Sequence, residues 1–194
     1  MPRALTEQEK AKQRNKLLKK GEEIILSHGI KRPSVDDIAK AAGMTKGTFY
    51  QHFESKEQFM YAVIMEWHQK VFEQAEIMLK GVENPYEAFR DFLTNLFTMP
   101  EMIASTKYYS EIKELMEAMS DKEEHSHEEV EEGMYKHLLL IIGVDIEKVK
   151  PGIVHNYVHM LYSMKGNGLM TQEDLQGTFD LMLDNLINYI SGGI

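Results

Sequence analysis

The residues whose spacing points most clearly to chemistry lie between positions 34 and 53. Ser34 is a favourable N-cap for a short helix, and Gly43 stands where the chain must leave that helix, because glycine enters the left-handed region without a Cβ penalty. Two residues later, Thr45 can cap a second helix over residues 46 to about 51. Two helices joined by a short turn with glycine form a helix-turn-helix, whose second helix can enter the major groove of DNA.

The first of these helices needs a buried face and a favourable start. Ile38, Ala39 and Ala42 form a small apolar stripe at helical spacing. Asp36 and Asp37 lie in the first turn, where carboxylates interact favourably with the helix dipole. Asp36 has a second possible role, in which its carboxylate accepts a hydrogen bond from cytosine N4 in DNA. A carboxylate would, however, also repel the DNA phosphates. The helix-dipole role is the preferred interpretation.

The combined pattern resembles the DNA-binding motif of the tetracycline-repressor (TetR) family of one-component bacterial regulators. The similarity runs from about Gly21 to Ile64, and its specificity lies in the joint spacing of several residues. The matching residues are Ile38-Ala39, Ala42-Gly43, Thr45 to Tyr50, His52-Phe53 and Lys56. The resemblance implies an all-α fold, with an N-terminal three-helix helix-turn-helix domain and a C-terminal helical domain for ligand binding and dimerisation.

The resemblance also implies that the start of the second helix reads DNA bases. Thr45, Lys46, Gly47 and Thr48 lie there. Lys46 has donors for guanine O6 and N7, and Thr48 can hydrogen-bond a base or place its methyl group on thymine. Gly47 would let the backbone approach the groove closely. Phe49 is either a core residue or a contact to a thymine methyl group.

A second group of residues matches family positions that grip phosphate. Tyr50, His52 and Lys56 belong to it, together with Ser34 and the backbone near Val35. Such contacts position a protein on DNA without reading its sequence. They also predict an affinity that falls as salt is added.

The net charge of −9 is unevenly distributed along the chain. Residues 1–60 hold twelve Lys or Arg and eight Asp or Glu, whereas residues 61–194 hold ten and twenty-three. This asymmetry is compatible with a nucleic-acid-facing end and an acidic body, or with solvated charge alone. Residues 6 to 28 are expected to form a long N-terminal helix. The same two interpretations apply to its basic residues, which are Lys10, Lys12, Arg14, Lys16, Lys19 and Lys20.

Composition excludes several other classes of protein. There is no cysteine, which removes disulfides, thiolate nucleophiles and cysteine-ligated zinc. The N-terminus lacks the apolar core of a signal peptide, and no apolar run is long enough to span a bilayer. We therefore expect a cytoplasmic protein that is not bound to a membrane. Without a phosphate-binding glycine loop, a nucleophile elbow or a matched acid/base pair, we expect no enzymatic activity.

Histidine pairs are the remaining candidates for a metal site. His155 and His159 stand at i and i+4, the spacing of two ligands on one helix face, but no zinc-protease motif surrounds them. His125 and His127 lie among glutamates, which a solvated acidic face explains more simply. The sequence therefore predicts neither a metal nor a cofactor.

Helical periodicity and caps predict roughly nine helices and no strand. Beyond residue 54, Ser55 and Gln58 form a capping box for a long helix to about Lys80, and Asn84-Pro85 begins the next. Residues 121–132 are either helical or a partly disordered loop. The remaining helices are expected at about 101–119, from Ser120 or Asp121 to about 142, from Lys150-Pro151 to Gly166, and from Thr171 to about 190.

The body of the chain is rich in methionine, with twelve of fourteen methionines at or after Met60. Methionine suits pockets that accept varied apolar ligands, although it also fills ordinary cores. We expect a small apolar or amphipathic effector to bind there. The aromatic residues that could line its site are Trp67, Phe89, Phe92, Tyr108, Tyr109 and Tyr157.

These observations predict a helix-turn-helix DNA-binding domain at residues 1–54 and an effector-binding and dimerisation domain at residues 55–194. The last two helices are apolar on more than one face, which favours a homodimer that binds a near-palindromic site on double-stranded DNA. The predicted function is a ligand-responsive transcriptional regulator, in the form of a repressor that releases its operator. The alternative is a small-molecule-binding or carrier protein with a vestigial helix-turn-helix. A more distant alternative is an adaptor protein whose acidic residues 121–132 bind a basic protein partner.

Overall fold

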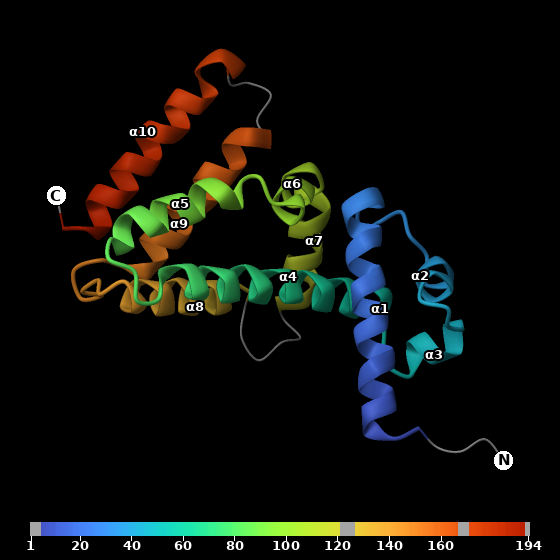
Figure 1. The fold of residues 1–194 in the computed structure, drawn as a ribbon. Helices are drawn as coiled ribbons and strands as arrows, with labels where there is room; N and C mark the ends of the chain where they lie inside the picture. The colour runs from blue at the N-terminus through green and yellow to red at the C-terminus, as the bar shows by residue number, and fades with distance from the viewer. Residues whose placement is uncertain (1–4, 121–126, 167–170, 193–194) are drawn as a thin grey trace. The chain divides into compact units, whose positions relative to one another are not determined.

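The computed structural model describes residues 5–120, 127–166 and 171–192. These residues form ten α-helices and no strand, which confirms the all-α prediction with one helix more than expected (Figure 1). None of these helices is long and apolar enough to cross a membrane. Their bounds are α1 Glu7–His28, α2 Val35–Ala41, α3 Lys46–Tyr50, α4 Lys56–Leu79, α5 Pro85–Leu96, α6 Pro100–Lys107, α7 Tyr109–Ser120, α8 His127–Ile141, α9 Pro151–Gly166 and α10 Gln172–Ile190.

The chain folds as two compact units, and each unit is formed by two segments that are separated in the sequence. Unit 1 comprises Met1–Trp67 and Tyr108–Lys122, and unit 2 comprises His68–Lys107 and Glu123–Ile194. Helix α4 therefore contributes to both units, with the division after Trp67. Unit 1 also includes α7, which nothing in the sequence groups with the first three helices.

Unit 1 has its own apolar core. Fully buried side chains from α1 to α4 form it, namely Leu17, Leu18, Ile25, Ile38, Ala42, Phe49 and Phe59. The rings of Phe49, Phe53 and Phe59 pack against one another with centroids 5.0–5.6 Å apart. At Gly21 of α1 an added Cβ would lie only 2.5 Å from Cζ of Phe59, so glycine permits the close packing of α1 and α4.

The turn between α2 and α3 has the chemistry that the sequence predicts. Ser34 is the N-cap of α2, and its hydroxyl accepts a hydrogen bond from the amide of Asp37. At the other end, Gly43 has a φ of 65°. Its amide donates to Lys40 O, and the next amide, of Met44, donates to the carbonyl of Ala39 at 2.8 Å. This pair of bonds is a Schellman motif, which ends α2 at a defined residue and directs the chain into α3.

Unit 2 is built around α9, which packs against α6, α8 and α10. Its buried core includes Phe89, Phe92, Leu93, Leu139, Val154, Val158, Leu161, Leu183 and Leu186. Phe97 contacts the rings of Tyr162 and Phe179 with centroids 4.8 and 4.5 Å apart. An ion pair between Arg90 and Asp184 joins α5 to α10. Segments far apart in the sequence thus form one core.

Three sequence predictions about helix ends need correction or fall outside the described residues. The single helix expected at about 101–119 is broken at Tyr108 into α6 and α7. The hydroxyl of Ser55 accepts from the amide of Gln58, but the Gln58 side chain accepts from the amide of Glu54, so the reciprocal half of the capping box is wrong by one residue. Ser120 ends α7, residues 127–132 are helical, and residues 121–126 lie outside the described residues.

Candidate nucleic-acid interface

The start of α3 carries the exposed residues for which the sequence predicts base reading. Thr45, Lys46 and Gly47 are exposed and Thr48 is half-buried. The Thr45 hydroxyl accepts from the amide of Thr48 at 3.1 Å and lies 3.0 Å from the Thr48 hydroxyl. Thr45 is therefore used as the N-cap, as predicted, and the exposed side chain of Lys46 is the stronger candidate for reaching a base.

The fold itself does not require glycine at position 47. A Cβ added there would meet only the Thr45 hydroxyl, at an ordinary contact distance of 3.7 Å, and the φ of Gly47 is not positive. Glycine in a helix destabilises it relative to alanine, so neither packing nor backbone conformation accounts for this residue. Close approach of another molecule to α3, as the family resemblance implies, is a physical reason for its presence.

The aromatic pair that follows divides between the surface and the core. Tyr50 is 49% exposed, and its ring meets the edge of Phe49 with centroids 5.4 Å apart. Phe49 has no exposed surface and packs against Phe53 and Phe59. A side chain without exposed surface cannot contact a thymine methyl group. Of the two interpretations given for Phe49, its burial supports the core one.

His52 lies beside the basic face of α1. Its Nε2 is 3.0 Å from Oε1 of Gln13, within hydrogen-bond distance. Partial burial, followed by the charges of Arg14 and Lys10, lowers the pKa of His52 below its usual value. The Arg14 guanidinium also lies over the Phe53 ring, 5.1 Å from its centroid. A phosphate bound here would reverse the effect of these two positive charges on His52.

Lys56 at the start of α4 has partners that the sequence did not predict. Its Nζ donates to the carbonyls of Ile30, Lys31 and Pro33 at 3.2, 3.0 and 3.2 Å. These residues belong to the connector between α1 and α2, residues 29–34, which leads into the N-cap Ser34. An ammonium group has three donors, so a direct phosphate contact would require one of these bonds to be released. Lys56 therefore fixes the connector in this structure.

The same connector is held from α7. The carboxylate of Glu111 accepts from the amides of Ile30 and Lys31 at 2.8 and 2.9 Å. The Tyr108 hydroxyl donates to the carbonyl of Ser27 near the end of α1. Sequence reasoning missed these contacts, because each joins residues 80 or 81 positions apart and no local motif indicates such a contact.

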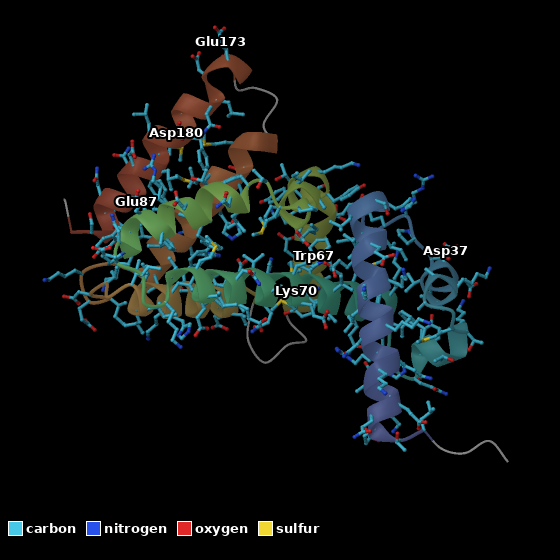
Figure 2. The ribbon with its side chains drawn as sticks, in the orientation of Figure 1. Asp37, Trp67, Lys70, Glu87, Glu173 and Asp180 are labelled. Carbon is cyan, nitrogen blue, oxygen red and sulfur yellow. The ribbon has the colours of Figure 1, made fainter. Side chains whose placement is uncertain are left out.

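The remaining predicted phosphate contacts lie at the start of α2. Ser34 is exposed and Val35 is half-buried. The Ser34 amide and hydroxyl both donate to Asp37, whose side chain closes a capping box, and these bonds lower the pKa of the Asp37 carboxyl. Figure 2 labels Asp37 on α2. The capping carboxylate is therefore Asp37, while Asp36 is exposed in the same turn.

The six aromatic residues predicted to line an effector site are divided between the two units. Trp67, Tyr108 and Tyr109 belong to unit 1, whereas Phe89, Phe92 and Tyr157 belong to unit 2. Tyr109 is 61% exposed, Phe89 and Phe92 are core residues of unit 2, and Tyr157 packs against that core. Trp67, labelled in Figure 2, is buried, and its Nε1 has no hydrogen-bond partner among the described residues. Their role in ligand binding stays a prediction.

Comparison with known proteins identifies the part of the chain that carries this geometry. Residues 17–63 match the family model for bacterial regulatory proteins of the tetR family, and these residues contain α2, α3 and the connector. Residues 17–63 therefore carry a TetR-family DNA-binding region. The HTH-type transcriptional repressor KstR2 of Mycolicibacterium smegmatis is 33% identical over 92 residues, which are 47% of this chain and 43% of KstR2. The chain thus spans less than half of this TetR-family relative.

Solved TetR-family structures share the fold over nearly the whole chain. A TetR-family transcriptional regulator from Pectobacterium atrosepticum aligns with a TM-score of 0.63 at 17% identity, covering 94% of each chain. RolR, solved in complex with resorcinol, aligns with a TM-score of 0.58 at 16% identity, covering 96% of each chain. At these identities the likeness shows the fold alone, and it extends the TetR architecture beyond the matched DNA-binding region.

Proposed function

We propose that this protein is a homodimeric DNA-binding regulator of the TetR family that represses transcription until a small molecule binds its helical body. The observation that carries the proposal is the exposed N-terminal turn of α3, which presents Lys46 beside a glycine that the fold does not require. A helix whose start is fixed by an N-cap such as Thr45 can place such residues in a major groove with a fixed orientation. The match of residues 17–63 to the TetR family model supports the same function, and members of that family are regulators rather than enzymes.

Selection of bound sequences from random duplex DNA, read by fluorescence anisotropy at several salt concentrations, tests DNA binding. We expect one near-palindromic motif and an affinity that falls steeply with salt. Lys46→Ala should change the base preference at one position in each half-site, whereas Lys136→Ala, at an exposed lysine of α8, should leave it unchanged. Absence of duplex binding at low salt would favour the alternative of a carrier protein with a vestigial helix-turn-helix.

The proposed dimer forms through α9 and α10. Ile153 and Met160 are 47% and 48% exposed and stand seven residues apart on α9, and Leu181 on α10 is 67% exposed. Apolar side chains exposed at helical spacing on the last two helices suit a four-helix interface between two copies. The measured mass should be twice the 22.5 kDa of one chain. Met160→Glu with Leu181→Glu should give a monomer, whereas Ile77→Glu, at an exposed isoleucine of α4, should not.

Effector binding would act on DNA affinity by favouring a second conformation of the protein. RolR, which shares the fold, was solved with resorcinol, and this supports a small-molecule effector in the helical body here. Helix α4 runs from unit 1 into unit 2, and α7 follows α6 directly in the chain. These are the covalent routes by which a change in unit 2 would reach the connector that Lys56 and Glu111 hold.

A further inference from the structure

One carboxylate and two imidazoles converge inside unit 2, apart from the DNA-facing residues. Glu131 comes from α8, and His155 and His159 come from α9, which packs against α8. Oε2 of Glu131 lies 2.8 Å from Nε2 of His155 and 3.0 Å from Nε2 of His159. One donor atom from each of the three residues lies within 4.8 Å of the other two. The i, i+4 pair seen in the sequence thus has a third ligand that only the fold supplies.

The cluster is buried at its carboxylate and open at one imidazole. Glu131 is 6% exposed, whereas the His159 side chain is 46% exposed. The two imidazole rings are 4.4 Å apart at their centroids, as expected for neighbouring turns of one helix face. On the other side of the carboxylate, Nδ1 of His68 in α4 lies 3.6 Å from Oε1. An ion could therefore enter from the His159 side and reach donors whose positions are fixed by packing.

We propose that Glu131, His155 and His159 bind a divalent first-row transition metal ion such as Zn²⁺. Two imidazoles and one carboxylate are a donor set that zinc sites use, with a fourth position left for water. Zinc bonds of about 2.0–2.2 Å in a tetrahedron place neighbouring donor atoms roughly 3.4 Å apart. The two carboxylate–imidazole separations of 2.8 and 3.0 Å therefore need only a small expansion. His68 lies where it can orient the carboxylate without binding the ion.

The competing explanation is a metal-free cluster in which the histidines neutralise a buried carboxylate. The Glu131 carboxylate raises the pKa of His155, which shows how strongly the two groups interact. The chain also contains a histidine–carboxylate contact of the ordinary surface kind. His137 of α8 lies 3.5 Å from Glu76 of α4, with the two side chains 60% and 42% exposed. Among the described residues, no further histidine or carboxylate completes a three-ligand cluster at this pair. This pair provides a matched control for the metal experiment.

Metal binding is tested on the full-length protein after treatment with a chelator. Calorimetric titration with Zn²⁺ measures affinity and stoichiometry, and the visible absorption of Co²⁺ reports its coordination by protein ligands. We expect one ion per chain for the wild type and for His137→Gln. His155→Gln with His159→Gln should weaken binding by at least about 100-fold, since losing a ligand costs more than the 10–100-fold typical of outer partners. Glu131→Gln retains the shape and hydrogen bonding of the side chain and should weaken binding comparably.

The metal titration does not depend on DNA binding, so its outcome tests the metal site independently of the proposed function. Circular dichroism of each metal-free variant establishes that its helices are retained. The proposal is wrong if the wild type takes up no more Zn²⁺ than the double histidine variant does. It is equally wrong if His125→Gln with His127→Gln abolishes binding while Glu131→Gln and His155→Gln with His159→Gln preserve it, because the ion would then sit in the acidic segment instead.

Discussion

Replacing Lys56 with methionine separates two roles for this residue, the phosphate contact implied by the family resemblance and the structural role seen in the fold. Methionine keeps an unbranched stem and removes the ammonium group that donates to three connector carbonyls. Each hydrogen bond from a charged group typically contributes about 1.5–3 kcal/mol. Because Lys56 is half-exposed, water replaces part of this contribution. A positive charge at the start of α4 also opposes the helix dipole by about 0.5 kcal/mol.

The net expectation is that Lys56→Met lowers the free energy of unfolding by about 2 kcal/mol. Urea titration followed by circular dichroism measures this quantity. Lys46→Met is the matched control, because Lys46 is exposed at the start of α3, and its free energy of unfolding should stay within about 0.5 kcal/mol of the wild type. In DNA binding, Lys56→Met should weaken affinity for all sequences equally by loosening the connector, without changing the salt dependence.

One pattern of results would refute this reasoning. If Lys56→Met is as stable as Lys46→Met, and its affinity depends on salt with a slope reduced by about one, the ammonium group acts on phosphate as the sequence predicted. The carbonyl contacts would then be dispensable for holding the connector.

Three further predictions concern the same unit. Gly47→Ala should raise the stability of the protein by about 0.5–1 kcal/mol in urea titration and weaken operator binding in anisotropy measurements; unchanged affinity would rule out close approach at this residue. Gly21→Ala places a Cβ 2.5 Å from Cζ of Phe59 and should cost about 1–3 kcal/mol in the same titration, whereas Gly133→Ala, with no atom within 4 Å, should not destabilise the protein. Because the folded protein lowers the pKa of His52 from its ordinary 6.5, stability should fall as pH drops through 6.5 toward that lower pKa, and DNA phosphate should restore the proton. Operator affinity should therefore rise between pH 7.5 and 6, and His52→Gln should flatten that profile.

Local chemistry explains which parts of the fold the sequence predicts well. The caps at Ser34, Thr45 and Asn84 and the turn at Gly43 involve residues within about five positions of one another, so their side-chain types suffice to indicate them. The break at Tyr108 is harder to predict, because helical periodicity continues on both sides of it.

Contacts between distant residues account for what the sequence does not predict. Glu131 and His155 are 24 positions apart, and nothing in the sequence joins this glutamate to the histidine pair until α8 and α9 pack together. For Phe49 the difficulty is that the local sequence suggests a DNA contact that the fold does not support. It stands within a run of residues that resemble DNA contacts, yet its direction toward Phe59 depends on α4 and cannot be deduced from α3 alone.

The connector between α1 and α2 links these observations to regulation. Its backbone makes few bonds of regular secondary structure; a carboxylate from α7 accepts from two of its amides, and an ammonium group from α4 donates to three of its carbonyls. Both side chains are set on helices whose chain continues into unit 2 or arrives from it. Coupling between an effector and DNA typically amounts to about 1–3 kcal/mol, which is the size of one such charge-assisted cluster. Loss or weakening of a single cluster at the connector is therefore sufficient in energy to change DNA affinity by the amount that the proposed regulation requires.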